Sequence, residues 1–251
     1  MTDTDIDHGL WVRRPAKASP GTPRLICLPH AGGSASFYLP MARGLAPGID
    51  VGLVQYPGRQ DRLREPCISD LRVLADAAFA ALRPELDHPV AFFGHSMGAT
   101  LAFEIAVRME EAGLPTPLRL FVSARRAPSA HRDERVHLRD DDGMIAEIRA
   151  LSGTDTRALG DEEIMRMAMP SIRADYTAAE TYRYQPGPLL RAPISVLVGE
   201  NDPKATLDET RLWREHTSEE TEMKVFSGGH FYLMQHQQEV LRLIRDRLTT
   251  G

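Results

Sequence analysis

The chain has 251 residues, of which 42% are hydrophobic, and its formal net charge is −5. That length suits one large α/β domain or two small ones, and the hydrophobic fraction is high enough for a substantial core. The negative charge gives no reason to expect nucleic acid, and no apolar run approaches the roughly 20 residues of a membrane-spanning helix.

The chain opens with the acidic stretch Met-Thr-Asp-Thr-Asp-Ile-Asp, which lacks the basic and apolar regions of a signal peptide. Its two cysteines, Cys27 and Cys67, stand in different contexts and form no metal-ligand pair. Cys27 lies in an apolar run and is expected to be a small buried hydrophobic residue. Such low cysteine use fits a reducing compartment, so we expect a cytoplasmic protein that binds neither metal nor membrane.

Short apolar runs alternate with amphipathic segments along most of the chain. Strands are predicted at residues 10–13, 24–28, 51–54, 90–96, 118–122, 194–198 and 223–226. Helices are predicted at residues 34–45, 70–82, 97–111, 207–216 and 231–248. Strands that alternate with helices through short turns favour an α/β fold, with a mostly parallel sheet and helices on both faces.

The stretch between residues 123 and 191 interrupts this alternation. It is rich in Arg, Asp and Glu, shows two or three helical patterns and contains no convincing strand. An insertion of this kind, just beyond the carboxyl edge of the sheet, is typical of a lid over a site. We therefore predict a single domain over residues 1–251 with a helical lid insertion at about 124–190.

The strand at 90–96 and the helix after it are joined by Gly94-His95-Ser96-Met97-Gly98. Gly-x-Ser-x-Gly at a strand-to-helix junction is the pattern of a nucleophile elbow. The turn is so sharp that the serine must adopt strained backbone geometry, and side chains two residues away on either side would collide. Gly94 and Gly98 remove those side chains. Ser96 is therefore the candidate nucleophile, and the Met97 N–H points where an oxyanion would form.

A serine nucleophile needs a base, and the base needs an acid that orients it. After a nucleophile elbow these partners follow on loops behind later strands, in the order Ser, Asp or Glu, His. The loop after strand 194–198 carries Asp202, and the loop after strand 223–226 carries His230, so these are the predicted acid and base. Glu200 and Asp208 are competing acids; Glu200 stands too near the strand end, and Asp208 is expected to start the next helix.

A second oxyanion donor is expected from the loop after an earlier strand. Pro29-His-Ala-Gly-Gly33 stands there, and the Ala31 N–H is the candidate, although the segment could also be a tight turn without chemistry. His30 and His95 flank the site but precede the acid in sequence. They are therefore candidate substrate contacts rather than the base.

Five blocks of the chain carry a family resemblance. They are Leu-Pro-His-Ala-Gly-Gly-Ser (28–34), Tyr-Pro-Gly-Arg (56–59), Gly-His-Ser-Met-Gly-Ala (94–99), Gly-Glu-Asn-Asp-Pro (199–203) and Ser-Gly-Gly-His-Phe-Tyr-Leu (227–233). Together they resemble the type II thioesterases, stand-alone α/β-hydrolases that accompany modular polyketide synthases and nonribosomal peptide synthetases. The lid segment 169–176 is similar to a Leu-Pro-x-Leu-Arg-Ala-Asp-Phe segment of that family. Gln60 departs from the family pattern, which leaves Arg59 as either a structural turn residue or a substrate contact.

The resemblance implies an editing role, in which aberrant or stalled acyl groups are hydrolysed from the phosphopantetheine arm of acyl or peptidyl carrier domains. It implies no cofactor, since the arm belongs to the substrate. The carrier must be another protein, because the chain has no Gly-x-Asp-Ser attachment site. Met165 and Met169 of the lid could line an adaptable acyl pocket or could be plain core. The lid arginines Arg125, Arg126, Arg132 and Arg135 could face an acidic carrier or form a solvated surface.

Three other functions remain open from the sequence. A small-molecule carboxylesterase would use the same triad, and a medium-chain fatty acyl thioesterase belongs to the same wider family. The non-enzyme alternative is a carrier-binding partner without turnover, against which the intact Ser96, Asp202 and His230 speak.

Overall fold

The structure, a computed structural model, describes residues 8–152 and 162–249. Within these ranges, seven strands form one sheet in the order β1-β3-β2-β4-β5-β6-β7. They are β1 (Val12–Arg13), β2 (Arg24–Leu28), β3 (Asp50–Val54), β4 (Val90–His95), β5 (Leu120–Ser123), β6 (Ile194–Gly199) and β7 (Thr221–Phe226). β1 pairs antiparallel with β3, and the other pairs are parallel, which confirms the predicted mostly parallel sheet. The predicted polar start at residues 1–7 lies outside the described ranges.

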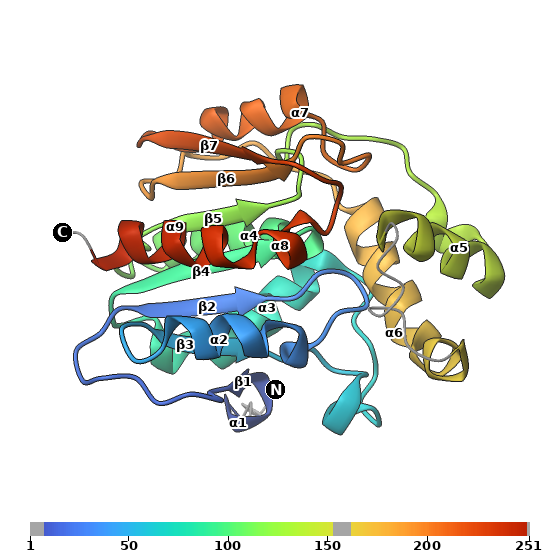
Figure 1. The fold of residues 1–251 in the computed structure, drawn as a ribbon, viewed down its shortest axis with the longest axis horizontal. Helices are drawn as coiled ribbons and strands as arrows, with labels where there is room; N and C mark the ends of the chain where they lie inside the picture. Colours follow the sequence, from blue (N-terminus) through green and yellow to red (C-terminus); the bar gives the residue numbers. More distant parts are fainter. Residues whose placement is uncertain (1–7, 153–161, 250–251) are drawn as a thin grey trace.

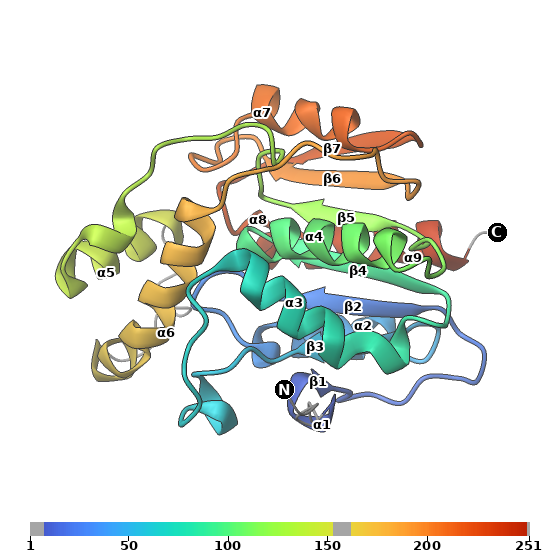
Figure 2. The same ribbon diagram turned by 180° about the vertical axis from the view of Figure 1, so that it is seen from behind.

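Helices cover both faces of the sheet (Figures 1 and 2). The described helices are α1 (His8–Trp11), α2 (Leu39–Leu45), α3 (Leu71–Leu82), α4 (Met97–Glu111), α5 (Asp141–Ser152), α6 (Glu162–Thr181), α7 (Leu207–Arg211), α8 (Tyr232–Gln235) and α9 (Gln237–Thr249). α3 and α4 pack on one face of the central strands, and α2 and α9 pack on the other. None of the helices in the described ranges is long and apolar enough to cross a membrane.

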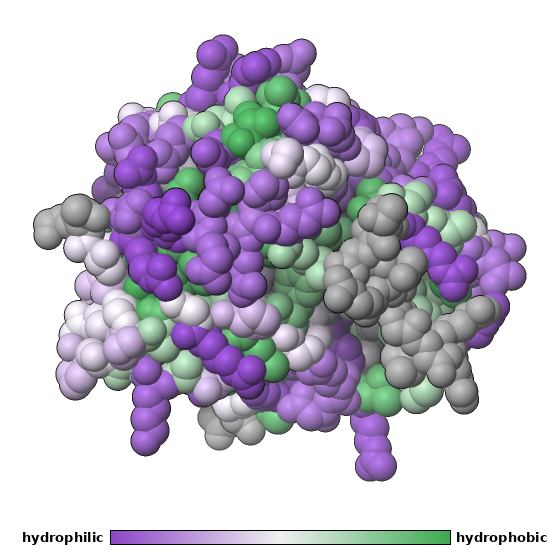
Figure 3. Space-filling model, in the orientation of Figure 1, coloured by the Kyte–Doolittle hydropathy of each residue, from purple (hydrophilic) through white to green (hydrophobic). Residues whose placement is uncertain are grey.

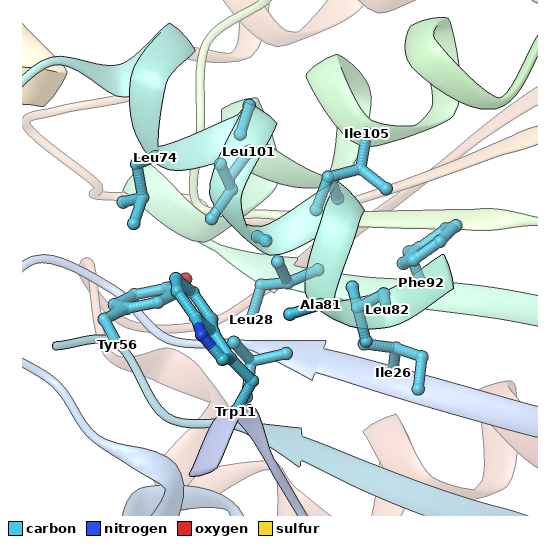
Figure 4. Packing of buried hydrophobic residues seen from close by; sticks show 14 of the residues in the cluster. Trp11, Ile26, Leu28, Tyr56, Leu74, Ala81, Leu82, Phe92, Leu101 and Ile105 are labelled. Atoms are coloured by element: carbon cyan, nitrogen blue, oxygen red, sulfur yellow. The ribbon is translucent and has the colours of Figure 1, made fainter. Parts of the chain in front are cut away.

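The central strands are apolar along their whole length because both faces are buried. In β4, Phe92 belongs to the same buried cluster as Leu74 of α3 and as Leu101 and Ile105 of α4, and Figure 4 shows these side chains between the helices and the sheet. Its neighbour Phe93 points to the opposite face and joins the cluster formed with α2 and α9. This alternation follows from the two-residue period of a strand. It fixes which side of the sheet each later residue of β4 faces.

The predicted insertion, residues 124–190, lies between β5 and β6 and holds α5 and α6. Both helices lie beyond the carboxyl ends of the parallel strands (Figure 1). They have a small apolar cluster of their own, to which Val136, Met144, Ile145, Met169 and Ile172 contribute. On the side of the molecule seen in Figure 3, hydrophobic residues form small areas among hydrophilic ones.

Several predicted elements differ from the structure. The predicted strand 10–13 is helical up to Trp11 and extended only over Val12–Arg13. The predicted helix 207–216 is α-helical only to Arg211 and continues as a 3-10 turn over Leu212–His216.

The predicted helix 34–45 begins as a 3-10 turn and becomes α-helical only at Leu39, and the Ser34 side chain makes no capping bond. Pro40 in the first turn explains that start, because proline lacks the N–H that a preceding helical turn would need. The predicted helix 231–248 is divided at His236, whose ring bonds to Ser227 instead of standing free on the helix surface.

Candidate active site

Ser96 lies at the junction of β4 and α4 with φ 55° and ψ −119°. A positive φ costs a non-glycine residue roughly 1–3 kcal/mol and persists only where the surroundings enforce it. A Cβ on Gly94 would lie 2.1 Å from the Gly98 carbonyl oxygen, and a Cβ on Gly98 would lie 2.0 Å from the Leu28 carbonyl oxygen. The turn therefore has the strained serine and the two obligatory glycines that the sequence pattern predicted.

The acid and the base lie together at the carboxyl ends of β6 and β7. The His230 Nδ1 is 2.9 Å from each carboxylate oxygen of Asp202. Both residues are almost fully buried, with exposures of 3% and 4%. The Lys204 N–H donates to Asp202 Oδ1 at 2.8 Å, which fixes the carboxylate from its other side. A carboxylate in this position holds an imidazole in one orientation and favours the tautomer with a proton on Nδ1.

The two loops approach each other closely enough to require glycine. A Cβ on Gly199 would lie 2.3 Å from the Gly229 carbonyl oxygen. The Asn201 N–H donates to the Gly228 carbonyl oxygen at 3.0 Å, and Gly228 has φ 109°. The competing acids point elsewhere. Glu200 is exposed, and Asp208 lies in the first turn of α7 with its side chain 92% exposed.

The loop after β2, residues 29–34, is held by hydrogen bonds on its backbone. The Tyr56 hydroxyl donates to the Pro29 carbonyl oxygen at 3.0 Å. Further along, the Gly33 N–H donates to the His30 carbonyl oxygen at 2.9 Å. Ala31, half-buried between these anchored positions, lines the same cavity as Ser96. This loop is therefore rigid where the second oxyanion donor was predicted.

An ion pair that the sequence reasoning missed joins this loop to the insertion. Arg59 donates to both carboxylate oxygens of Asp175 on α6, at 2.6 and 2.8 Å, and the two side chains are 7% and 1% exposed. Arg59 also donates to the Gly33 carbonyl oxygen at 3.0 Å, and Asp175 accepts the Gly32 N–H at 2.8 Å. The signal in the sequence was the pair of family blocks 56–59 and 169–176, but nothing in them shows that they meet. Of the two readings of Arg59, the structural one is supported.

Ser96, His230, Ala31 and His30 line a cavity of about 260 Å³ between the sheet edge and the insertion. One part of its wall is apolar and includes Phe37, Ile148, Met165, Ile172, Ala179 and Met234. Another part is charged and includes Arg125, Glu134, Glu180 and Lys204. A largely apolar cavity with a few convergent polar groups is the usual form of a small-molecule site. The apolar part of its lining could accommodate an acyl chain.

Two predicted substrate contacts do not reach this cavity, and they are corrected here. His95 does not line it; its ring is fully buried, with Nδ1 2.9 Å from the Ser123 hydroxyl. The cause is strand alternation, because His95 shares a side of β4 with Phe93 and points beneath the site. Met169 is buried in the apolar cluster of the insertion, whereas Met165 does line the cavity.

His30 does line the cavity, and its environment keeps it neutral. Its ring makes edge contacts with Phe37 and Phe231, with centroids 4.6 and 5.0 Å away. Burial, together with the neighbouring His230 and Arg59 side chains, lowers the pKa of His30 to about 3. A charged imidazole is disfavoured there because it would lose hydration among apolar rings. His30 therefore presents an uncharged ring to the cavity.

Within residues 8–152 and 162–249, no group of three or more His, Cys, Asp or Glu side chains is arranged to hold a metal ion.

Comparisons with known proteins agree with this arrangement. Residues 23–248 match the model of a thioesterase domain. The chain is 50% identical over 240 residues to a Streptomyces griseus protein named "Probable cadicidin biosynthesis thioesterase", covering 96% of this chain and 66% of that protein. It is 47% identical to the thioesterase PikA5 of Streptomyces venezuelae, covering 99% and 89% of the two chains.

Solved structures give the same result. The type II thioesterase BorB of the borrelidin biosynthetic cluster is similar with a TM-score of 0.92 and 52% identity, covering 99% of this chain and 100% of BorB. The RedJ thioesterase of Streptomyces coelicolor is similar with a TM-score of 0.87 and 34% identity, covering 94% and 95%. The chain therefore belongs to the thioesterase family and has the α/β-hydrolase fold that its sequence predicted.

Proposed function

We propose that this protein hydrolyses acyl groups from the phosphopantetheine arm of carrier domains, through an acyl-enzyme on Ser96. The observation that carries the proposal is the buried Asp202–His230 pair, whose imidazole lines the same cavity as Ser96. A serine on a strained turn that shares a cavity with an imidazole oriented by a carboxylate is typical of a serine hydrolase. In a thioesterase the bond that it attacks is a thioester.

In the proposed mechanism, His230 takes the proton of Ser96 while Oγ attacks the thioester carbonyl carbon. The Ala31 and Met97 N–H groups stabilise the oxyanion of the tetrahedral intermediate. The C–S bond then breaks, and the thiol of the arm leaves with the proton from His230. In the second half, His230 removes a proton from water, whose oxygen attacks the acyl-enzyme. The acid is released, and the proton on His230 returns to Ser96.

No cofactor of the protein's own enters these steps, because the phosphopantetheine arm arrives with the substrate. Carrier domains of a polyketide synthase or nonribosomal peptide synthetase are the proposed partners. The names of several relatives support this proposal. One of them is the type II thioesterase YbtT of the yersiniabactin pathway, whose structure is 30% identical in sequence to this chain with a TM-score of 0.84. In such a pathway the protein would remove aberrant or stalled acyl groups from the carrier domains. We propose that it does so in the cytoplasm.

Arg126, Arg132 and Arg135 of the insertion are each engaged by a carboxylate of the described residues. Three ion pairs engage them: Arg126–Glu134, Arg132–Glu209 and Arg135–Asp133. Arg126 is also almost fully buried, with 4% exposure. These contacts favour the alternative reading, in which the arginines stabilise the insertion. We therefore assign no carrier surface to them.

The proposal is tested by comparing hydrolysis of one acyl group from a purified carrier domain and from N-acetylcysteamine, with Ser96→Ala as the blank. We expect a higher kcat/KM for the carrier-bound thioester. Equal values for the two thioesters would favour a thioesterase that does not recognise carriers. Faster turnover of a matched oxygen ester would favour a carboxylesterase, and a steep preference for medium-length chains would favour a fatty acyl thioesterase.

A further inference from the structure

Helix α6 touches the 29–34 loop through two residues one helical turn apart. Asp175 Oδ2 accepts the Gly32 N–H at 2.8 Å. Ile172 packs so close that a Cβ on Gly32 would lie 2.8 Å from its Cγ1. Gly32 has φ 74°, a conformation that glycine adopts without strain. The bond to Asp175 therefore fixes the direction of the Gly32 N–H, and the packing of Ile172 fixes the distance between Gly32 and α6.

Arg59 completes the contact from the side of the sheet. Its guanidinium holds both oxygens of Asp175 and, through Nη1, the Gly33 carbonyl oxygen. The two side chains are almost fully buried, so these charge-assisted bonds are not screened by water. Asp175 Oδ2 is shared between Arg59 Nη1 and the Gly32 N–H. This shared oxygen joins the ion pair directly to the backbone of the 29–34 loop.

The hydrogen-bonded backbone groups of His30, Gly32 and Gly33 lie on either side of Ala31 in the chain. The N–H groups of Gly32 and Gly33 are both occupied, by Asp175 and by the His30 carbonyl oxygen. Ala31 precedes Gly32 directly and lines the cavity beside Ser96. The direction of its N–H depends on the peptide planes that these bonds hold. A misplacement of about 1 Å in such a donor can cost a factor of roughly 100 in rate.

We propose that Asp175 is a positioning residue, whose carboxylate on the insertion holds the 29–34 loop so that the Ala31 N–H faces the oxyanion. This inference rests on the proposed function, in which Ala31 stabilises that oxyanion. It also makes α6 a fixed wall of the site.

The primary test is Asp175→Asn. An amide has one acceptor oxygen, so it cannot serve the Gly32 N–H and both guanidinium nitrogens together. We expect kcat to fall at least about tenfold while KM stays within about twofold, because a ground-state carbonyl depends less on the donor than the oxyanion does. The inhibition constant of a trifluoromethyl ketone transition-state analogue should rise by a similar factor.

Glu104→Gln is the matched control. Glu104 is a buried carboxylate of α4, and it accepts a hydrogen bond from the Tyr182 hydroxyl at 2.7 Å. Tyr182 directly follows α6, and Glu104 is distant in sequence from the 29–34 loop. We expect this variant to lower Tm and to leave kcat and analogue affinity unchanged. Equal losses of kcat and analogue affinity in Glu104→Gln and Asp175→Asn would show that any damage at the insertion suffices, and would overturn the proposal.

The double variant Arg59→Met/Asp175→Leu covers the case in which Asp175→Asn fails to fold. Replacing both members of a buried ion pair by apolar residues is often neutral for stability. We expect the folded double variant still to lose kcat, because Gly32 has no acceptor. A kcat within about twofold of the unsubstituted enzyme, in either folded variant, contradicts the positioning role. Ser96→Ala separates the two claims, since an active Ser96→Ala refutes the proposed function itself.

Discussion

Asp202 places both of its carboxylate oxygens 2.9 Å from Nδ1 of His230, in a setting where both side chains are nearly inaccessible to water. The carboxylate therefore directs the imidazole and stabilises the positive charge that it acquires when it takes a proton. Asp202→Asn removes that charge and permits the wrong tautomer. We expect kcat for thioester hydrolysis to fall by about 10³-fold or more, with little change in Tm. Asp208→Asn, at an exposed position on α7, is the control and should retain full activity.

The pH dependence of activity should be insensitive to His30. Its pKa is lowered to about 3, so the ring is neutral throughout the range above pH 4. The acid limb of the kcat/KM profile then belongs to another group. We predict that the acid-limb midpoint of His30→Phe lies within about 0.3 pH unit of the midpoint for the unsubstituted enzyme, even if the substitution changes the rate. A midpoint displaced by a full unit would show that His30 titrates in the catalytic range.

The glycines of the serine turn should not tolerate a methyl group. In Gly98→Ala, the new Cβ would meet the Leu28 backbone oxygen at 2.0 Å, and no side-chain movement relieves such a contact. We expect a loss of at least about 3 kcal/mol in the free energy of unfolding, measured with denaturant, or failure to fold. Gly187→Ala is the control, because nothing lies within 4 Å of the added atom. A stable, active Gly98→Ala would refute the geometry of the turn.

Glu134 should contribute to stability in a pH-dependent way. Burial alone would raise the pKa of Glu134, but Arg126 and Lys204 outweigh it and lower that pKa to about 2. A carboxyl whose folded pKa lies below its unfolded value stabilises the protein above the unfolded pKa, near 4.5, and loses that contribution as the pH falls towards 2.

Glu134→Gln should therefore lower the free energy of unfolding at pH 7 by about 1 kcal/mol after allowance for solvent screening, and by less at pH 3. Denaturant titrations at the two pH values measure both quantities. Glu111→Gln, at an exposed position at the end of α4, is the control and should change neither. A deficit for Glu134→Gln that is larger at pH 3 than at pH 7 would contradict the sign of the pKa shift.

Local rules made the serine turn and its partners predictable. Gly94 and Gly98 indicate a turn in which neither position has room for a Cβ. The apolar strand before the turn places it at the carboxyl edge of the sheet. Parallel strands bring their carboxyl ends to one edge, so the loops with Asp202 and His230 had to lie near each other. The order of these residues along the chain was thus enough to assemble a candidate site.

Contacts made by the insertion were not predictable in the same way. Arg59 and Asp175 are 116 residues apart, and their pairing depends on how α6 lies across the sheet edge, which no local pattern encodes. The side that Met169 faces likewise depends on how α5 packs against α6. His95 is a different case, since the two-residue period of β4, applied from Phe93 onward, would have placed it beneath the site.

The most direct test of an acyl-enzyme on Ser96 is rapid-quench mass spectrometry after mixing the protein with an acylated carrier domain. We predict a transient increase in mass, equal to the acyl group, on the peptide that contains Ser96, and no such increase in Ser96→Ala. His230→Ala should slow both formation and loss of the adduct. Release of the acid without any adduct on Ser96, or wild-type turnover by Ser96→Ala, would contradict the proposed mechanism.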